Sequence, residues 1–151
     1  MRILVINGPN LNLLGMRKPA LYGVTTLPQI HEMIRSRAAE LGVEVECVQH
    51  NCEGDIIDAI HSAIGTADGI VINPGGYTHT SIAIRDAYES IPIPVVEVHL
   101  TNIHAREDFR AKSMTGGAAK GIITGLGPDG YLYALDYLVR LAREKAEGQR
   151  E

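Results

Sequence analysis

The stretch Arg2-Ile3-Leu4-Val5-Ile6-Asn7-Gly8-Pro9-Asn10 opens the chain with a strand-length apolar run that ends in polar and turn-forming residues. Successive side chains of a strand point to opposite faces of a sheet, so this apolar run predicts a strand that is covered on both faces. The same pattern continues along the chain. Apolar runs at 43–49, 69–73, 95–99 and 121–124 alternate with stretches of helical period at 27–41, 55–64, 79–90, 106–112 and 129–145.

The helical stretches show the stripes and end signals of helices packed on a sheet. The first begins at a capping-box pattern, Thr26-Leu27-Pro28-Gln29, and Gly42 is its stop signal. Three stretches carry one apolar stripe each, namely Leu27, Ile30, Ile34, Ala38 and Leu41; Ile56, Ile60 and Ile64; and Tyr131, Leu135, Leu138 and Leu141. Five strands alternating with helices predict an α/β fold, a doubly wound parallel sheet of order 2-1-3-4-5 with helices on both faces. The charged segment after Leu141 is expected to fray.

The composition limits the number of domains and the kinds of partner. With 151 residues, 45% of them hydrophobic, the chain is expected to form a single domain over residues 1–151. A net charge of -4 and an isoelectric point near 5.8 argue against nucleic acid or an anionic membrane as partners. The apolar runs are too short to span a membrane and no signal peptide is evident, so we expect a cytoplasmic protein. Cys47 and Cys52 lack metal or redox spacing and are interpreted as reduced thiols.

Three strand ends supply polar residues that are expected to meet. In the 2-1-3-4-5 order, ligands bind beyond the carboxyl ends of the strands, at the switch between the first and the third. Asn7-Gly8-Pro9-Asn10, Asn73-Pro74-Gly75-Gly76 and His99 follow the first, third and fourth strands. The sequence therefore predicts one polar crevice at this edge.

Two pairs near this crevice suggest acid–base chemistry. Glu97 and His99 leave the same face of their strand, so Glu97 is expected to orient the imidazole as a proton donor. The long segment 8–23 resembles a lid and carries Arg17 and Tyr22, whose proximity would favour a phenolate base. For Arg17 and Tyr22 taken singly, a solvated arginine and a ring that anchors the loop are the commoner uses.

Further residues could hold a polar ligand. His79 and Asp86, seven residues apart, are expected on one helical face, although a capping histidine and a solvated aspartate are equally plausible. Asn73 could be a simple turn residue before proline. Leu100-Thr101-Asn102 could offer amides to a carboxylate, with positive charge from Arg106 and Arg110.

Missing motifs narrow the reaction class. The sequence has no P-loop, no G-x-G-x-x-G after the first strand, no metal-ligand spacing and no G-x-S-x-G. No lysine falls at a strand end in the predicted crevice, so a Schiff base is not expected. Cofactor-free and metal-free acid–base chemistry on a small polar molecule remains.

The motifs together resemble the type II 3-dehydroquinate dehydratases, over nearly the whole chain. The matching segments are Asn7-Gly8-Pro9-Asn10-Leu11-Asn12, Arg17-Lys18-Pro19 with Tyr22-Gly23, Asn73-Pro74-Gly75-Gly76-Tyr77-Thr78-His79-Thr80-Ser81, Glu97-Val98-His99, His104-Ala105-Arg106-Glu107, and Gly125-Leu126-Gly127 with Gly130-Tyr131. This resemblance implies a flavodoxin-like hydro-lyase without cofactor that eliminates water from 3-dehydroquinate through an enolate, giving 3-dehydroshikimate. The reaction belongs to the shikimate pathway, which makes aromatic amino acids, and to quinate breakdown.

The resemblance also implies roles for individual residues. Tyr22 would be the base, His99 oriented by Glu97 the acid, and Arg17 a stabiliser of negative charge. Asn10 would hold a water at the enolate oxygen. The implied substrate-binding residues are Asn73, His79, Asp86, Leu100, Thr101 and Arg110. Asp86 would reach a neighbouring subunit, and the implied assembly is a homododecamer, a tetramer of trimers.

The chain departs from the expected family pattern at Lys18, Thr101 and Thr115-Gly116-Gly117-Ala118. Lys18 adds charge beside the base, and Thr101 crowds the carboxylate pocket. The alternative function is a flavodoxin-like lyase or isomerase acting on a phosphorylated sugar, with Gly75-Gly76 as the phosphate site. A non-catalytic flavodoxin-like binding module is the other alternative. A phospho-receiver, however, needs acids where Asn7 and Asn73 stand, and flavin carriers usually stack aromatic side chains, while this chain has no Trp.

Overall fold

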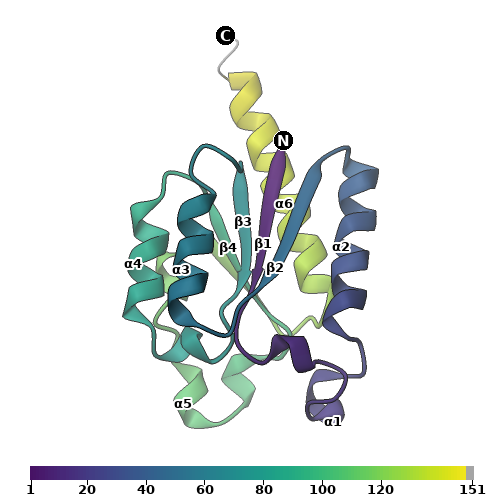
Figure 1. The fold of residues 1–151 in the computed structure, drawn as a ribbon, viewed down its shortest axis with the longest axis vertical. Coiled ribbons are helices and arrows are strands. Elements are labelled where there is room, and N and C mark those ends of the chain that lie inside the picture. Colours follow the sequence, from purple (N-terminus) through teal and green to yellow (C-terminus); the bar gives the residue numbers. More distant parts are fainter. Residues whose placement is uncertain (149–151) are drawn as a thin grey trace.

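The computed structural model describes residues 1–148, which build a five-stranded parallel sheet flanked by helices (Figure 1). The strands are β1 (Arg2–Asn7), β2 (Glu44–Gln49), β3 (Gly69–Asn73), β4 (Val95–His99) and β5 (Gly121–Thr124). The α-helices are α1 (Pro19–Tyr22), α2 (Leu27–Leu41), α3 (Glu53–Ser62), α4 (Ile82–Ser90), α5 (Asp108–Ala111) and α6 (Asp129–Gly148). The order β2-β1-β3-β4-β5 confirms the predicted topology.

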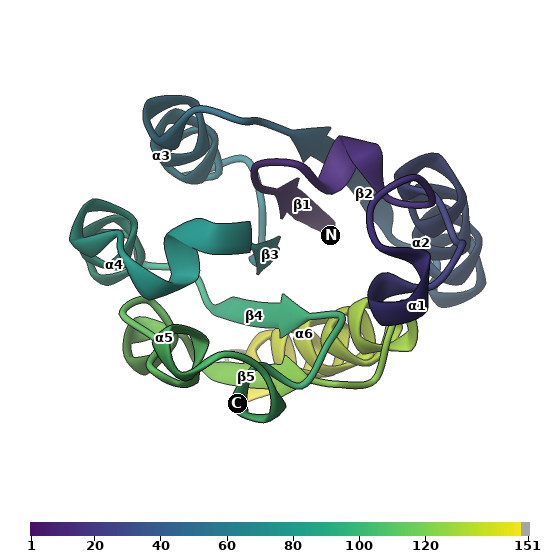
Figure 2. The same ribbon diagram turned by 90° about the horizontal axis from the view of Figure 1, so that it is seen from below.

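Two layers of helices cover the sheet, as the two-sided strands predict. The helices α2 and α6 pack on one face, and α3 and α4 pack on the other (Figures 1 and 2). Alternate residues of β1 point to the two cores: Ile3 and Val5 to the first, Leu4 and Ile6 to the second. The capping box is also confirmed, since the Thr26 hydroxyl accepts from the Gln29 amide and the Gln29 side chain accepts from the Thr26 amide.

Several expected boundaries are shifted. The segment 55–64 forms α3 over Glu53–Ser62, and Ile64, expected on its buried stripe, lies beyond the helix end and is exposed. The segment 106–112 forms only the four-residue α5. The last helix continues past the predicted end at 145 to Gly148, so the segment after Leu141 is helical and the prediction that it frays was wrong over the described residues. Residues 149–151 lie outside the described part of the chain.

The helix expected at 79–90 begins three residues later. Gly75–His79 form a 3₁₀ turn, and α4 begins at Ile82 because the Ser81 hydroxyl accepts a hydrogen bond from the Ile84 amide, 2.9 Å away. His79 and Asp86 are therefore not on one helix, and their predicted common face was wrong.

The carboxyl ends of the central strands lie together at the lower edge of the sheet in Figure 1, between α1 and α5. Asn7 pairs with Asn73 in the β1–β3 register, and the Gly8 amide donates to the Asn73 carbonyl at 2.8 Å. A Cβ on Gly8 would lie 2.5 Å from the Pro74 carbonyl oxygen, so only glycine allows the two turns to approach this closely.

Two sequence expectations concern surfaces rather than the sheet. No helix within residues 1–148 is long and apolar enough to cross a membrane. Cys47 and Cys52 are free thiols, and burial raises the pKa of Cys47 to about 11. Cys47 is therefore a poor nucleophile at neutral pH.

Candidate active site

A narrow cavity lies at the carboxyl edge of the sheet, where the sequence predicted a polar crevice. Its lining residues come from the ends of β3 and β4, the lid segment and the segment around α5. They are Leu11, Arg17, Tyr22, Asn73, Gly75, Gly76, His79, His99, Leu100, Thr101, Ile103, Arg106 and Arg110. Its volume, about 40 Å³, is far below the ~300 Å³ or more of typical ligand pockets. The cavity is therefore smaller than a ring-sized ligand needs.

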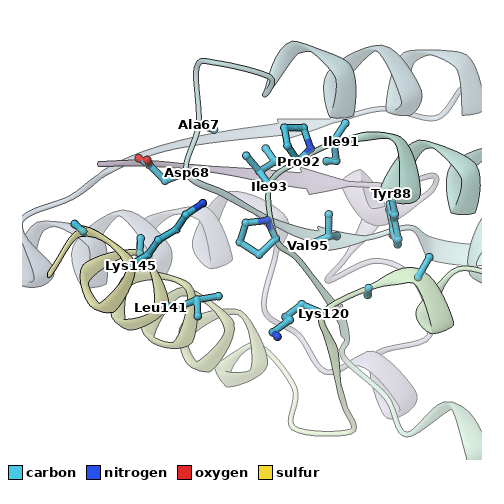
Figure 3. Close-up of a pocket in the computed structure, with 15 residues that line it drawn as sticks. Ala67, Asp68, Tyr88, Ile91, Pro92, Ile93, Val95, Lys120, Leu141 and Lys145 are labelled. Atoms are coloured by element: carbon cyan, nitrogen blue, oxygen red, sulfur yellow. The ribbon is translucent and has the colours of Figure 1, made fainter. Parts of the chain in front are cut away.

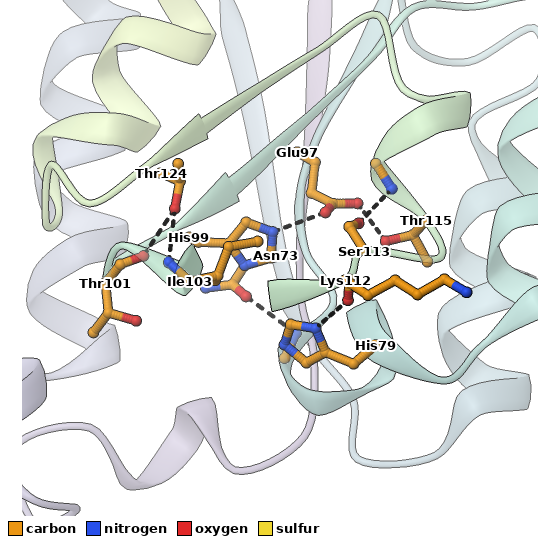
Figure 4. A network of polar contacts seen from close by, with 12 residues as sticks. Asn73, His79, Glu97, His99, Thr101, Ile103, Lys112, Ser113, Thr115 and Thr124 are labelled. Carbon is orange, nitrogen blue, oxygen red and sulfur yellow. Dashed lines mark hydrogen bonds and ion pairs between the residues drawn. The ribbon is translucent and has the colours of Figure 1, made fainter. Parts of the chain in front are cut away.

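Glu97 and His99 form the predicted pair on β4. Both side chains are buried, and the His99 Nε2 lies 2.8 Å from the Glu97 Oε1 (Figure 4). A carboxylate only accepts hydrogen bonds, so Nε2 carries a proton and Nδ1 is the ring nitrogen left for a ligand in the cavity. Glu97 thus fixes the tautomer and compensates the positive charge that the ring carries when doubly protonated.

Two hydroxyl groups from other elements complete the shell around Glu97. The Thr115 hydroxyl donates to the Glu97 Oε2 at 2.6 Å, and the Tyr88 hydroxyl on α4 donates to the same oxygen at 3.1 Å. Burial, followed by the Glu97 charge, raises the pKa of Tyr88 well above its usual value, so the phenol keeps its proton. Three donors therefore surround the fully buried Glu97 carboxyl group and fix its orientation. The sequence analysis named neither hydroxyl as a partner of Glu97.

The lid side of the cavity is organised by guanidinium groups. The Arg17 Cζ lies 4.8 Å and the Arg106 Cζ 5.2 Å from the centroid of the Tyr22 ring. Tyr22 ends the four-residue α1, and its side chain is half-buried. Lys18 caps that helix in a left-handed conformation with φ 39°, and it is exposed outside the cavity lining. The structure therefore places Arg17 beside Tyr22, as predicted, and adds Arg106 as a second cation.

Arg106 is the cavity residue whose role the sequence analysis left least defined. Its side chain is only 9% exposed, and besides Tyr22 it reaches Glu107, at 3.6 Å, and the Thr101 hydroxyl, at 3.5 Å. The spacing to Arg110 indicated positive charge but not contact with Tyr22. That contact depends on how α5 and the lid fold toward each other.

His79 and Arg110 line the wall opposite the lid. The His79 Nδ1 lies 2.8 Å from the Lys112 carbonyl oxygen, so Nδ1 carries the proton and Nε2 is the free nitrogen of the ring (Figure 4). Burial lowers the pKa of His79, with smaller contributions from Arg110 and His99. Arg110 in turn is held by Glu107 at 2.9 Å.

The segment after β4 lines the cavity floor. Leu100, Thr101 and Ile103 contribute, and a threonine on β5 holds the turn, since the Thr124 hydroxyl donates to the Thr101 carbonyl at 3.0 Å and accepts from the Ile103 amide at 3.2 Å (Figure 4). The backbone here is fixed before any ligand binds.

The structure does not bring all predicted site residues into the cavity. Asn10 adopts a left-handed conformation with φ 67°; its side chain is exposed and it is not among the lining residues. Asp86 is exposed on α4 and also lies outside the lining. The remaining predicted ligand-binding residues, together with Arg17, Tyr22 and His99, line the cavity.

A second, larger hollow of about 740 Å³ lies at the opposite edge of the sheet (Figure 3). It is lined mainly by apolar side chains and prolines, including Ile91, Pro92, Ile93 and Leu141, with Lys120 and Lys145 at its margin. Its lining residues include no histidine and no arginine. The histidines and arginines that could act on a ligand lie in the smaller cavity.

The smaller cavity combines a candidate acid, His99, with a candidate base, Tyr22, and with hydrogen-bond donors. Residues 1–148 contain no group of three or more His, Cys, Asp or Glu side chains that could hold a metal ion. Tyr22 and His99 both line this cavity. Fold and site together define a flavodoxin-like α/β protein with an acid–base site at the switch point of its sheet.

The comparisons with known proteins place the chain more narrowly. The family model described as dehydroquinase class II matches residues 1–139, and the chain belongs to this family. The catabolic 3-dehydroquinase 2 of Neosartorya fischeri is 56% identical over 138 residues, covering 91% of this chain and 92% of the relative. A 3-dehydroquinate dehydratase of Halothermothrix orenii is 53% identical over 143 residues, covering 95% and 97%.

Solved structures show the same likeness. The type II dehydroquinase of Butyrivibrio crossotus superimposes with a TM-score of 0.90 at 49% identity, covering 91% of this chain and 97% of that chain. The 3-dehydroquinate dehydratase-like protein of Bifidobacterium longum is more distant, with a TM-score of 0.71 at 30% identity, covering 93% and 97%. The flavodoxin-like fold and the family expected from the sequence are confirmed.

Proposed function

We propose that this chain is a hydro-lyase that eliminates water from 3-dehydroquinate to give 3-dehydroshikimate, with Tyr22 as base and His99 as acid. The observation that carries the assignment of roles is that His99, held 2.8 Å from the buried Glu97 carboxyl group, lines the same cavity as Tyr22. Family membership and the names of the relatives support the substrate. The reaction is common to the shikimate pathway and to quinate breakdown, and the relatives named above include a catabolic enzyme.

In the first step the Tyr22 phenolate takes the proton alpha to the ketone. The electron pair of the C–H bond moves toward the carbonyl, and an enolate forms. Arg17 and Arg106 support this step because their positive charges, both within about 5 Å of the Tyr22 ring, stabilise the negative charge that develops on the enolate. In this account the exposed Asn10 turns toward the cavity once substrate is bound, and holds a water at the enolate oxygen.

In the second step the enolate electrons return and expel the hydroxyl group on the neighbouring carbon. His99 gives the proton on Nδ1 to the leaving oxygen, so water departs rather than hydroxide. Glu97 keeps Nε2 protonated throughout, which leaves Nδ1 as the nitrogen that loses and regains the proton. Tyr22 gains one proton from the substrate and His99 gives one proton to the leaving water. The enzyme therefore has no net gain or loss of protons, and no cofactor is consumed.

The other lining residues hold the substrate. Asn73, His79 and Arg110 bind ring hydroxyl groups, and the amides of Leu100 and Thr101 bind the carboxylate. Thr124 fixes that turn, and the Thr101 hydroxyl accepts a hydrogen bond from Arg106 at 3.5 Å. The small cavity volume implies that Arg17 and Tyr22 swing out for substrate entry.

Assembly and location extend the same proposal. Residues 1–151 act as one catalytic domain in a cytoplasmic homododecamer, a tetramer of trimers, in which the exposed Asp86 contacts the site of a neighbouring subunit. Sedimentation of the purified protein measures the assembly. An active monomer would contradict the role of Asp86.

The test of the activity is direct. Purified protein is mixed with 3-dehydroquinate, and the conjugated enone of the product is followed by ultraviolet absorbance. Turnover that persists with a chelator and after treatment with borohydride is expected, because the mechanism uses neither a metal nor an imine. Lack of product would overturn the proposal. Inactivation by borohydride in the presence of substrate would indicate an imine formed by a lysine, and would contradict the assignment of Tyr22 as base.

The alternative functions find less support. A lyase or isomerase of phosphorylated sugars would use Gly75 and Gly76 for phosphate, but the Gly75 amide already donates to the Asn73 side chain at 3.1 Å. Inhibition by inorganic phosphate without turnover of 3-dehydroquinate would favour it. A phospho-receiver needs acidic side chains at the ends of β1 and β3. Asn7 and Asn73 at these positions are neutral and are hydrogen-bonded to other side chains, which argues against this alternative.

A further inference from the structure

A buried chain of hydrogen bonds runs from the cavity residue Asn73 into the core, through groups that have no role in the proposed mechanism. Asn7 and Asn73, at the ends of β1 and β3, both contact the hydroxyl of Tyr131 on α6. Tyr131 is 1% exposed, and burial raises its pKa far above the usual value, so the phenol keeps its proton. Such a chain is stable only if each donor faces an acceptor.

The direction of this chain is fixed at its far end. The Asn7 Nδ2 lies 3.1 Å from the His31 Nε2 and 3.5 Å from the Val48 carbonyl oxygen, and a carbonyl oxygen only accepts. Nδ2 therefore occupies that side, and the Asn7 Oδ1 faces Tyr131. The Tyr131 hydroxyl donates its single proton to this oxygen at 2.6 Å.

The direction at the cavity end agrees independently. Since the Tyr131 proton is used, its oxygen can only accept, and it accepts from the Asn73 Nδ2 at 3.2 Å. This places the Asn73 Oδ1 toward the Gly75 amide, a group that only donates, at 3.1 Å. Two backbone groups at opposite ends thus require the same order of donors and acceptors.

We propose that Tyr131 is a positioning residue that locks the Asn73 amide with its oxygen committed to the Gly75 amide and one N–H left for the cavity. The site then presents Asn73 as a donor and selects a ligand oxygen that accepts a hydrogen bond at this position. This inference rests on the proposed function for the identity of the ligand, but the locked amide is a property of the protein alone. Asn7 serves as the second positioning residue, because its side-chain oxygen accepts the only proton of the Tyr131 hydroxyl.

The kinetic test is a double-mutant cycle between Tyr131→Phe and Asn73→Ala. Asn73 contacts a part of the substrate that does not react, so loss of its orientation weakens ground state and transition state alike. We expect Tyr131→Phe to raise KM about tenfold and to change kcat less than about twofold. In the Asn73→Ala background the same substitution should have little further effect on KM, because the group through which it acts is gone. Tyr133→Phe, an exposed tyrosine on the same helix, is the matched control and should leave KM unchanged.

The outcomes separate the two proposals. Independent, additive effects on KM, or an unchanged KM in Tyr131→Phe, would overturn the positioning role. A wild-type protein without turnover overturns the proposed function instead, and the locked amide is then judged by urea unfolding of the same four proteins. Coupled stability losses support it, and additive losses overturn it. If Tyr131→Phe does not fold, Asn7→Ala replaces it in the same cycle, with the same expected rise in KM.

Discussion

The two walls of the cavity hold their reacting groups by different means. His99 lies at the end of a central strand, 5% exposed, against a carboxylate that accepts three hydrogen bonds. Tyr22 is half-exposed on a four-residue helix within the lid, next to two guanidinium groups. The proposed acid is positioned by directional hydrogen bonds in the core, whereas the proposed base lies beside guanidinium charges on the segment proposed as a lid.

The largest effect is expected on the lid side. Tyr22→Phe removes the base but keeps the ring and its guanidinium contacts, so kcat should fall about 10³-fold or more. The thermal midpoint should stay close to that of the wild type because the hydroxyl supports no part of the core. The enone assay and a thermal melt measure the two. An active Tyr22→Phe protein would remove Tyr22 as base.

A somewhat smaller loss is expected on the strand side. Glu97→Gln keeps the shape of the side chain but replaces one acceptor oxygen with an NH2 group, which faces donors from three residues. The ring of His99 then loses the acceptor that fixes its tautomer. We expect kcat to fall about 10²-fold to 10³-fold, with a stability loss that Tyr22→Phe does not show. His99→Ala is the companion variant. If Glu97→Gln were as stable and as active as the wild type, the buried shell would have no role.

Removing one donor from that shell should give a moderate effect. Thr115→Val deletes the 2.6 Å hydrogen bond to the carboxylate, and the free energy of unfolding should fall by about 1–3 kcal/mol. Turnover should fall by less than in Glu97→Gln, because Tyr88 and His99 still hold the carboxylate. Thr115→Ser retains the hydroxyl and should recover most of both losses. Equal behaviour of Val and Ser would show that packing, not the bond, matters.

The smallest effect is a pH dependence of stability. The folded protein lowers the pKa of His79 below its value of 6.5 in the unfolded chain, mainly through burial. On acidification the unfolded state binds the proton first, so the contribution of neutral His79 is complete above 6.5 and is lost as the pH falls through the folded pKa. Urea unfolding between about pH 7.5 and about pH 5 should show this fall. His79→Asn should show a shallower one, and an identical slope would contradict the assignment.

The sequence predicted those features that depend on short-range periodicity. Residues two apart on a strand share a face, so Glu97 and His99 could be paired without a structure, and the two-sided strand at 2–7 indicated a sheet with helices on both faces. The helix around 55–64 was placed by its apolar stripe, but periodicity does not mark an end. The chain leaves the helix before Gly65, at φ 72°, and Ile64 becomes exposed.

Other features depend on contacts between distant segments. The start of α4 was misplaced because polar residues stand at 79, 80 and 81, and the sequence does not show which of them caps the helix. The Ser81 hydroxyl is the cap, since it accepts the hydrogen bond from the Ile84 amide. Tyr88 and Thr115 reach Glu97 from other elements, at separations that follow no spacing rule. Tyr131 lies 124 residues from Asn7, and the chain of hydrogen bonds between them follows only from the packing of α6 on the sheet.

The most direct test of the division of labour is exchange of the hydrogen alpha to the ketone of 3-dehydroquinate in deuterated water, followed by nuclear magnetic resonance. In His99→Ala the base still acts while the hydroxyl cannot leave, so the account predicts enzyme-dependent exchange without product. In Tyr22→Phe it predicts neither exchange nor product above the rate without enzyme. Exchange by Tyr22→Phe at the wild-type rate, or a complete lack of exchange in a folded His99→Ala protein, would contradict the account.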